Sequence, residues 1–324
     1  MTRGPARQTV SLRISVTDRC ELRCAYCAPV VSALKVAPEE ILSYDEIVRL
    51  VRLIKTRYKV TEARLTGGEP LMRPGIERLV AMLAAEGVPD IALTTNGQRL
   101  EGVARTLKQA GLNRVNISLD SLNPATFAAL SGGGVLGNTL EGVAAALRAG
   151  LRPLKLNTVV LRGRNDHETI DLVRFAMRRD CQVRFLELMP IGVAAAGFED
   201  LFVSSEEVRQ RLAAEFALAA LPVDPEATSR NWLGEDGRGG RVVIGFISPY
   251  SEPFCAGCPR LRLTSTGVLI GCLARPDGIP LAPLLRGKTA ADVKALDAAV
   301  ERAFGMKRRD RAFAQPCAMV GIGG

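Results

Sequence analysis

Histidine is nearly absent from this chain, since His167 is the single one among 324 residues. We therefore do not expect chemistry that needs a histidine base or a metal site built on three histidines. Aromatic residues make up only 5% of the sequence, which disfavours a base-stacking surface for single-stranded nucleic acid. No run of about 18 apolar residues occurs, so we expect no membrane-spanning segment.

The first residues also lack the apolar stretch of a secretory signal peptide, which makes the cytoplasm the expected compartment. In that reducing environment, the eight cysteines are expected to be metal ligands or thiols rather than disulfides. The net charge of +9, from 43 basic and 34 acidic residues, fits a polyanionic partner or simply an arginine-rich solvated surface.

Strand-like segments alternate with helical patterns between residues 11 and 188. Ser43 followed by Glu46 is typical of a capping box and predicts the start of the first helix. Pro74 fits the first turn of a second helix, and Gly87 fits its end. Such repeats predict a parallel sheet, open or curled into a barrel, with ligands at the C-terminal strand ends. The predicted strands are 12–16, 63–66, 91–94, 115–119, 155–161 and 183–188, and further helices are predicted over 100–110, 140–149 and 167–178.

The pattern changes after residue 190. Ser204 and Glu207 predict one more capped helix, and residues 222–240 are rich in proline, glycine and charge, which predicts a linker or exposed loop. The C-terminal part carries a cysteine group of its own. We therefore predict two domains, residues 1–221 and residues 222–324.

The most informative motif is Cys20, Cys24 and Cys27, with the spacing C-x3-C-x2-C. Three thiolates can hold three irons of a [4Fe–4S] cluster, which usually has four cysteine ligands. The fourth iron would then keep an open position for a substrate or cofactor. A structural zinc site is the alternative, but zinc sites usually show cysteine pairs with a fourth ligand nearby. The spacing thus predicts a reactive cluster.

The segment Gly67-Gly68-Glu69-Pro70 follows the second predicted strand. Glycines permit close backbone approach, and the glutamate could receive an ammonium group, although such a segment alone would more often be a plain turn. Placed one strand–helix unit after a three-cysteine loop, it resembles the radical S-adenosylmethionine superfamily. The resemblance implies that S-adenosylmethionine binds the open iron, that this segment receives its ammonium group, and that Tyr26 lies near the adenine.

A second cysteine triplet, with the spacing C-x2-C-x13-C, consists of Cys255, Cys258 and Cys272. A zinc site with a remote fourth ligand such as Cys317 is one interpretation. We favour a second [4Fe–4S] cluster with an open iron, because Arg260 and Arg262 alternate and would share one side of a strand. Two cations beside an open cluster suit an anionic or electron-rich ligand.

Blocks over nearly the whole chain resemble the GTP 3′,8-cyclase family of molybdenum cofactor biosynthesis. The first block, residues 12–20, reads Leu-Arg-Ile-Ser-Val-Thr-Asp-Arg-Cys. The block at residues 254–263 reads Phe-Cys-Ala-Gly-Cys-Pro-Arg-Leu-Arg-Leu, and the chain ends in Gly323-Gly324, as that family's tail does. The other blocks are 65–73, 114–122, 156–160, 183–187, 245–249 and 272–273.

The resemblance implies an α/β fold, an incomplete (βα)6 TIM-like barrel with a smaller C-terminal domain that carries an auxiliary Fe–S cluster. It also implies a lyase that uses two [4Fe–4S] clusters and S-adenosylmethionine. Such an enzyme converts GTP to (8S)-3′,8-cyclo-7,8-dihydroguanosine 5′-triphosphate, an early step of molybdopterin synthesis. A 5′-deoxyadenosyl radical would take the C3′ hydrogen of GTP, and the C3′ radical would attack guanine C8.

The resemblance assigns roles to individual residues. The implied cluster ligands are Cys20, Cys24, Cys27, Cys255, Cys258 and Cys272. The implied S-adenosylmethionine contacts are Tyr26, Gly67, Gly68, Glu69, Thr95, Ser118 and Met189. The implied GTP contacts are Arg13, Arg64, Lys155, Arg184, Arg260 and Arg262. Arg13, Arg260 and Arg262 would surround the substrate as catalytic residues, while Lys155 and Arg184 would hold the triphosphate together with Arg64. The terminal Gly-Gly would reach into the active site.

The implied partners are GTP, a reductant such as flavodoxin or ferredoxin, a downstream cyclic pyranopterin monophosphate synthase and a second copy of the chain in a homodimer. No nucleic acid and no membrane is expected as a partner. Cys181 is expected to be a small buried hydrophobic residue at the start of a strand.

Three positions depart from the family's pattern: Glu21 replaces the usual Asn, Ala28 replaces Met, and Glu62 stands where some relatives carry a basic residue. None is a proposed ligand. A paralogous two-cluster radical enzyme that acts on a peptide or another small molecule is the alternative. A non-catalytic Fe–S electron carrier would explain the cysteines but not the Gly-Gly-Glu-Pro segment.

Overall fold

The computed structural model describes residues 8–27, 36–255, 257–275, 277–287, 289–307, 313 and 319–322. Within these residues the strands form one twelve-stranded sheet. They are β1 (Thr9–Ser15), β2 (Lys59–Thr66), β3 (Ile91–Thr95), β4 (Arg114–Ser118), β5 (Lys155–Val159), β6 (Gln182–Leu186), β7 (Ala217–Ala220), β8 (Arg230–Glu235), β9 (Arg241–Ile247), β10 (Arg260–Leu263), β11 (Val268–Ile270) and β12 (Ile279–Pro280). The α-helices are α1 (Tyr44–Arg57), α2 (Ile76–Ala85), α3 (Ala104–Gln109), α4 (Pro124–Ser131), α5 (Leu136–Arg148), α6 (Thr169–Arg178), α7 (Phe198–Leu201), α8 (Ser205–Ala213), α9 (Ala282–Arg286), α10 (Ala290–Gly305) and α11 (Met319–Ile322).

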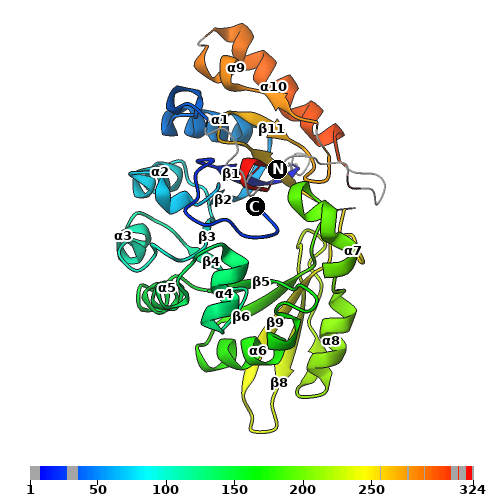
Figure 1. Ribbon diagram of the computed structural model, residues 1–324. Coiled ribbons are helices and arrows are strands. Elements are labelled where there is room, and N and C mark those ends of the chain that lie inside the picture. The colour runs from blue at the N-terminus through cyan, green and yellow to red at the C-terminus, as the bar shows by residue number, and fades with distance from the viewer. Residues whose placement is uncertain are drawn as a thin grey trace, which may run out of the picture.

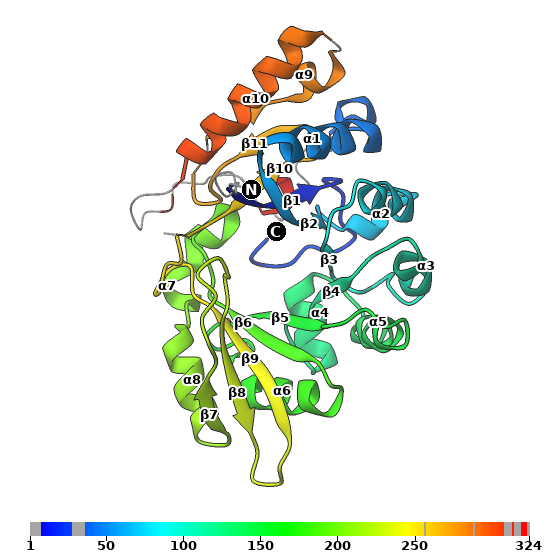
Figure 2. The same cartoon turned by 180° about the vertical axis from the view of Figure 1, so that it is seen from behind.

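Strands β1 to β6 pair in sequence order, and all five pairs are parallel, as the alternating pattern predicts. The sheet curls into an open arc, with α1, α2, α3 and α5 on its outer side (Figures 1 and 2). This is the α/β arrangement of a partial TIM-like barrel. The C-terminal strands extend both edges, since β10 pairs in parallel with β1 and β9 pairs in parallel with β6. Strands far apart in the sequence thereby become neighbours in one sheet.

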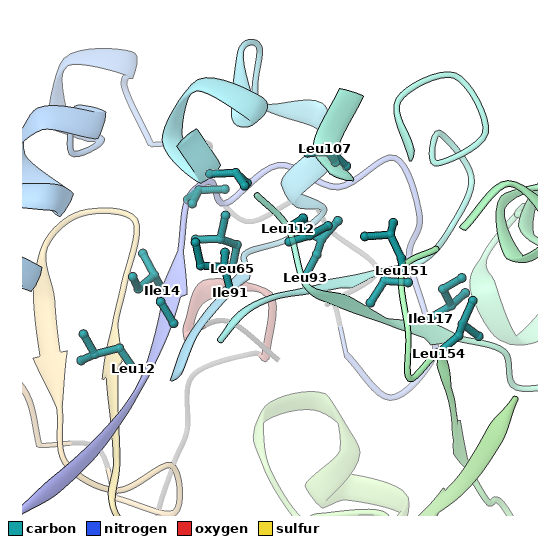
Figure 3. Close-up of a cluster of buried hydrophobic side chains, with 14 of the residues drawn as sticks. Leu12, Ile14, Leu65, Ile91, Leu93, Leu107, Leu112, Ile117, Leu151 and Leu154 are labelled. Carbon is teal, nitrogen blue, oxygen red and sulfur yellow. The ribbon is translucent and has the colours of Figure 1, made fainter. Parts of the chain in front are cut away.

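The main core lies between the sheet and the outer helices. Along β1, Leu12 and Ile14 are almost fully buried and point toward this core, together with Leu65 of β2 and Leu93 of β3 (Figure 3). Because side chains alternate along a strand, Arg13 between them faces the concave side. Apolar residues therefore stabilise the outer face, and polar residues are left for the inner face.

Two predicted helix starts are confirmed. The Ser43 side chain caps α1 in a capping box with Glu46, and Ser204 caps α8 in the same way with Glu207. A lost N-cap of this kind costs about 1 kcal/mol. Cys181 at the start of β6 is buried as expected, with 5% of its surface exposed.

Other predicted boundaries were wrong. The helix expected from Pro74 begins only after Gly75, which adopts a left-handed conformation with φ of 70° as its N-cap. Residues 222–240 are not all loop, because they contain β8, which pairs with β7 and β9. The short helix α4 was not predicted at all. In the part of the chain that the structure describes, no helix has both the length and the apolar character needed to cross a membrane.

Candidate active site

The first cysteine loop, residues 20–27, follows β1 and is held against the end of α4. The backbone N–H of Arg23 donates to the carbonyl oxygen of Ser131 at 2.9 Å, and the N–H of Ala25 donates to that of Leu130 at 3.0 Å. These bonds fix the backbone of the loop through main-chain groups alone. The loop thus has a defined place at the C-terminal ends of the strands, as predicted.

The glycine segment after β2 packs directly on residues 17–19, which lead from β1 into this loop. The N–H of Gly68 donates to the Thr17 carbonyl at 2.8 Å, and the N–H of Glu69 donates to the Arg19 carbonyl at 2.7 Å. A Cβ atom on Gly68 would lie 2.4 Å from the Arg19 carbonyl oxygen, and one on Gly67 would lie 2.6 Å from that of Thr17. Only glycine allows the two backbones to approach so closely. Both glycines therefore position the cysteine loop.

Two thiols of this loop, those of Cys20 and Cys24, are partly buried and lie near acidic groups. Burial raises the pKa of Cys20 to about 12. Burial also raises the pKa of Cys24, and the nearby Asp120 carboxylate adds to this effect. Such thiols ionise when a metal supplies positive charge, so the donor set fits an iron–sulfur cluster. Among the described residues, no three His, Cys, Asp or Glu side chains converge as ligands of a single metal ion do.

Glu69 is a buried carboxylate surrounded by neutral donors. It is 1% exposed and accepts hydrogen bonds from the Thr95 hydroxyl at 2.7 Å, the Asn96 N–H at 2.8 Å and the Leu71 N–H at 2.9 Å. Burial raises its pKa to about 7, although these bonds oppose the shift. A buried carboxylate of this kind is well suited to bind an ammonium group. Thr95 is itself buried, and the hydrogen bond from its hydroxyl orients the Glu69 carboxylate.

Tyr26 and Asp120 form a pair above β4. The Tyr26 hydroxyl donates to Oδ2 of Asp120 at 2.6 Å, and the N–H of Val159 donates to Oδ1 at 2.9 Å. Burial raises the pKa of Asp120 to about 6. The sequence motifs assign no role to Asp120. Its position directly after the predicted strand 115–119 is the signal that could have identified it. Ser118, half-buried at the end of β4, lies two residues before it.

A cavity of about 190 Å³ lies beside the second cysteine triplet. Its wall brings together residues from β1, β2, β6 and the C-terminal part of the chain. The lining includes all three cysteines of the second triplet, Met189, and five of the predicted GTP contacts, Arg13, Arg64, Arg184, Arg260 and Arg262. The register explains this gathering, because Arg13 of β1 stands opposite both Arg64 and Arg262.

The arginines raise a strong positive potential in the cavity. Burial lowers the pKa of Arg13, and the charges of Arg262, Arg64 and Arg260 lower it further. Burial also lowers the pKa of Arg184 to about 9 and that of Arg262 to about 10. An anion in the cavity would relieve this repulsion, which makes the site suitable for a phosphate-bearing ligand.

Two buried polar atoms on residues of the cavity wall are unsatisfied hydrogen-bonding groups. Among the described residues, Nε of Arg184 and Oδ1 of Asn157 have no hydrogen-bond partner. Buried polar groups are nearly always hydrogen-bonded, so these atoms are places where a polar ligand could bind. No motif in the sequence includes Asn157, which lies within β5.

Lys155 and Glu62 belong to the same charged group. Burial and the charge of Arg184 lower the pKa of Lys155 to about 7. Burial would raise the pKa of Glu62, but Arg64 and Arg114 overcome this effect and lower it to about 2. Glu62 accepts a bond from Arg64 at 2.5 Å and pairs also with Arg114. Arg114 was missed from the sequence because only the curled sheet brings it near the others.

The second triplet lies among cations, unlike the first. Burial would raise the pKa of the Cys258 thiol, but the charges of Arg260 and Lys307 outweigh it and lower the pKa. Arg260 in turn stacks over the Phe254 ring, with 4.8 Å between the guanidinium carbon and the ring centroid. The Cys258 thiolate is therefore easier to form, which suits a metal ligand.

The C-terminal helix α11 approaches the same cavity. Met319 lines the cavity wall, and Ile322 is buried against Ile191 and Ile270. The predicted Gly323 and Gly324 tail lies outside the described residues, as do Ala28 and Cys317. Of the other departures, Glu21 accepts a bond from Arg99 at 3.3 Å.

Two family models divide the chain between them. Residues 14–176 match the Radical SAM superfamily, and residues 181–313 match Molybdenum Cofactor Synthesis C. The first of these implies S-adenosylmethionine and an iron–sulfur cluster as cofactors. Among solved structures, Streptococcus suis SuiB bound to S-adenosylmethionine is similar in fold, with a TM-score of 0.64 and 15% identity over 89% of this chain and 66% of that chain.

Curated relatives cover almost the full length. A GTP 3′,8-cyclase of Moorella thermoacetica is 41% identical over 98% of both chains. GTP 3′,8-cyclase 1 of Pseudomonas aeruginosa is 43% identical over 91% of this chain and 89% of its own. One from Geobacter sulfurreducens is 41% identical over 91% of this chain and 89% of its own. The chain therefore belongs to the GTP 3′,8-cyclase family, as the sequence blocks predict.

Proposed function

We propose that this protein converts GTP to (8S)-3′,8-cyclo-7,8-dihydroguanosine 5′-triphosphate, an early step of molybdenum cofactor biosynthesis. One observation carries the proposal: a single cavity unites the second cysteine triplet with Arg13, Arg260 and Arg262. A substrate there would meet both a metal cluster and three cations. The relatives named GTP 3′,8-cyclase support the same reaction.

The first triplet, Cys20, Cys24 and Cys27, would hold a [4Fe–4S] cluster beside S-adenosylmethionine. When bound and reduced, this pair would supply a 5′-deoxyadenosyl radical for removal of the C3′ hydrogen of GTP. Formation of the C3′–C8 bond would then require one further electron, from the reductant, and one proton. Glu69 would bind the ammonium group of S-adenosylmethionine. Further contacts to S-adenosylmethionine would come from Gly67, Gly68, Thr95, Ser118 and Met189, and Tyr26 would lie near the adenine.

Cys255, Cys258 and Cys272 would hold a second [4Fe–4S] cluster, which would supply a binding position for the guanine. Arg13, Arg260 and Arg262 would surround the nucleotide and keep it in reach of the radical. Arg64, Arg184 and Lys155 would hold the triphosphate, since charge-assisted bonds to phosphate are strong. In this arrangement Asn157 and the unpartnered Nε of Arg184 would gain hydrogen bonds.

We further propose that residues 222–324 act as the cluster-bearing C-terminal domain and residues 1–221 as the partial barrel. Both edges of the arc receive strands from that C-terminal part, which would close the open side over the substrate. Electrons would come from flavodoxin or ferredoxin in the cytoplasm. The product would pass to a cyclic pyranopterin monophosphate synthase, and the working form would be a homodimer.

The test is the release of 5′-deoxyadenosine by anaerobically reconstituted protein with reductant and S-adenosylmethionine. We expect release to depend on GTP, because the radical needs the C3′ hydrogen. Arg260→Ala should keep its iron content but lose GTP-dependent release, since it removes a cation from the cavity. Equal release without GTP, or unchanged release by Arg260→Ala, would contradict the proposal.

A further inference from the structure

Lys307 lies beside the second cysteine triplet, although no sequence motif includes it. Its partly buried Nζ donates to the carbonyl oxygens of Arg260 and of Gly271, the latter at 2.7 Å. The same Nζ lies 3.9 Å from Sγ of Cys258. Arg260 comes two residues after Cys258, and Gly271 directly precedes Cys272. One ammonium group therefore bridges the two chain segments that carry the triplet.

The fold holds Lys307 in this position. It follows α10, which packs on the sheet through buried residues that include Ala299 and Ala303. A Cβ atom on Gly271 would lie 2.0 Å from the Ala303 carbonyl oxygen, so the helix end and the strand end touch. The ammonium also lies 5.6 Å from the centroid of the Phe304 ring. Lys307 is thus placed by packing, unlike a surface lysine.

Lys307 differs from the neighbouring arginines in what it contacts. Arg260 and Arg262 line the cavity, whereas Lys307 is not among the described residues of its wall. The hydrogen bonds of Lys307 go to main-chain oxygens beside the cysteines and to Sγ of Cys258. Its charge therefore acts on the triplet and not directly on a ligand in the cavity.

We propose that Lys307 is a positioning residue for the second triplet, which ties its two segments together and raises the reduction potential of the cluster bound there. The inference rests on the proposed second cluster. Hydrogen bonds to the sulfurs and nearby charge set the potentials of such clusters. Reduction adds one electron to the cluster, so an adjacent cation stabilises the reduced form more than the oxidised form.

The second cluster can be measured alone in the full-length chain with Cys20, Cys24 and Cys27 replaced by alanine. This parent should hold about four irons after reconstitution. Its midpoint potential is read by a redox titration with mediators, followed by electron paramagnetic resonance. A parent without iron would refute the second cluster itself, a result that does not depend on residue 307.

In this parent, Lys307→Met should shift the midpoint potential downward, because it removes the charge but keeps the length of the side chain. Lys307→Arg keeps the charge and should stay nearer to the parent in both iron content and potential. Arg302→Met is the matched control, since it removes an exposed cation from the last turn of the same helix. It should change neither quantity. Lys307→Gln provides a second neutral side chain if the methionine variant does not fold, as judged by thermal melting.

An unchanged potential in the folded neutral variants would overturn the inference. Loss of iron from the neutral variants, with iron retained in Lys307→Arg, would support the positioning role. Equal loss of iron from Lys307→Arg, with an intact fold, would contradict the role of the charge. A merely structural residue would change the melting temperature without moving the potential.

Discussion

At the scale of single residues, burial raises the pKa of Glu69 and makes its carboxylate favour a cationic ligand. The carboxylate receives three hydrogen bonds from neutral donors, yet burial still raises its pKa to about 7. A bound cation would complete its environment. If that cation is the ammonium of S-adenosylmethionine, the interaction is a charge-assisted hydrogen bond worth about 1.5–3 kcal/mol.

We therefore predict that Glu69→Gln weakens S-adenosylmethionine binding by roughly 10- to 100-fold. Calorimetric titration of the reconstituted protein measures this. Glu168→Gln is a suitable control, because Glu168 is also a buried carboxylate with neutral donors, Ser121 at 2.6 Å and Leu122 at 2.7 Å. The control should bind normally. Normal binding by Glu69→Gln would exclude the assigned role.

The lowered pKa of Lys155 should couple substrate binding to the uptake of a proton. Burial, followed by the charges of Arg184, Arg114 and Arg64, lowers its pKa to about 7, so most of it is neutral at pH 8. Between that value and the unfolded value of about 10.4 the unfolded chain binds more protons, so this group's contribution to stability increases as pH rises. A bound triphosphate would reverse the shift and protonate Lys155.

GTP binding at pH 8 should therefore take up protons, because the phosphates, with a last pKa of about 6, are already ionised. Calorimetry in two buffers of different ionisation enthalpy measures the uptake. Lys155→Met should reduce it, since Arg184 and Arg262 have higher pKa values and are mostly charged already. Identical heats in both buffers for the unsubstituted protein would rule this linkage out.

At the scale of elements, the end of β2 and the cysteine loop after β1 form one unit through Gly68. A Cβ atom there would meet the Arg19 carbonyl at 2.4 Å, so backbone must move to make room. Overpacking of this kind costs about 1–3 kcal/mol. Because the loop carries the first triplet, the movement should also disturb its metal ligands.

Gly68→Ala should thus lower the melting temperature and reduce the iron bound by the first triplet. Gly102→Ala is the matched control, because a Cβ atom there meets nothing within 4 Å. Iron per chain and thermal melting are measured for both. Full iron content and an unchanged melting temperature in Gly68→Ala would show that the close approach is not needed.

Comparison of the helices and strands with the sequence shows which local patterns are sufficient to predict an element. Local signals predicted well, as with the capping boxes at Ser43 and Ser204 and the six strands of the barrel. Strand β8 was missed because only Trp232 and Leu233 of its six residues are apolar, and the segment becomes a strand by pairing with β7 and β9. Helix α4 was missed because it lacks an apolar stripe, although Asn123 caps it and Pro124 starts it.

At the scale of the whole molecule, the curled sheet assembles the site from distant segments. Cysteine spacing and arginine alternation predicted the two triplets and Arg260 and Arg262 as chemically important. The second triplet, Arg260 and Arg262 share one cavity with Arg13 because β1 pairs with β10, and no local pattern encodes this pairing. For the same reason, Arg114, Asn157 and Lys307 could not be found from the sequence.

The central claim is that this cavity holds GTP for a radical cyclisation. The most direct test is mass spectrometry of the product formed anaerobically from GTP, S-adenosylmethionine and reductant. Transfer of the C3′ hydrogen to deoxyadenosine, formation of the C3′–C8 bond, and addition of one electron and one proton to the nucleotide leave a product with the mass of GTP. We predict a new nucleotide of that mass with different chromatographic retention and fragmentation. Recovery of GTP alone, while the two clusters are intact, would contradict the account.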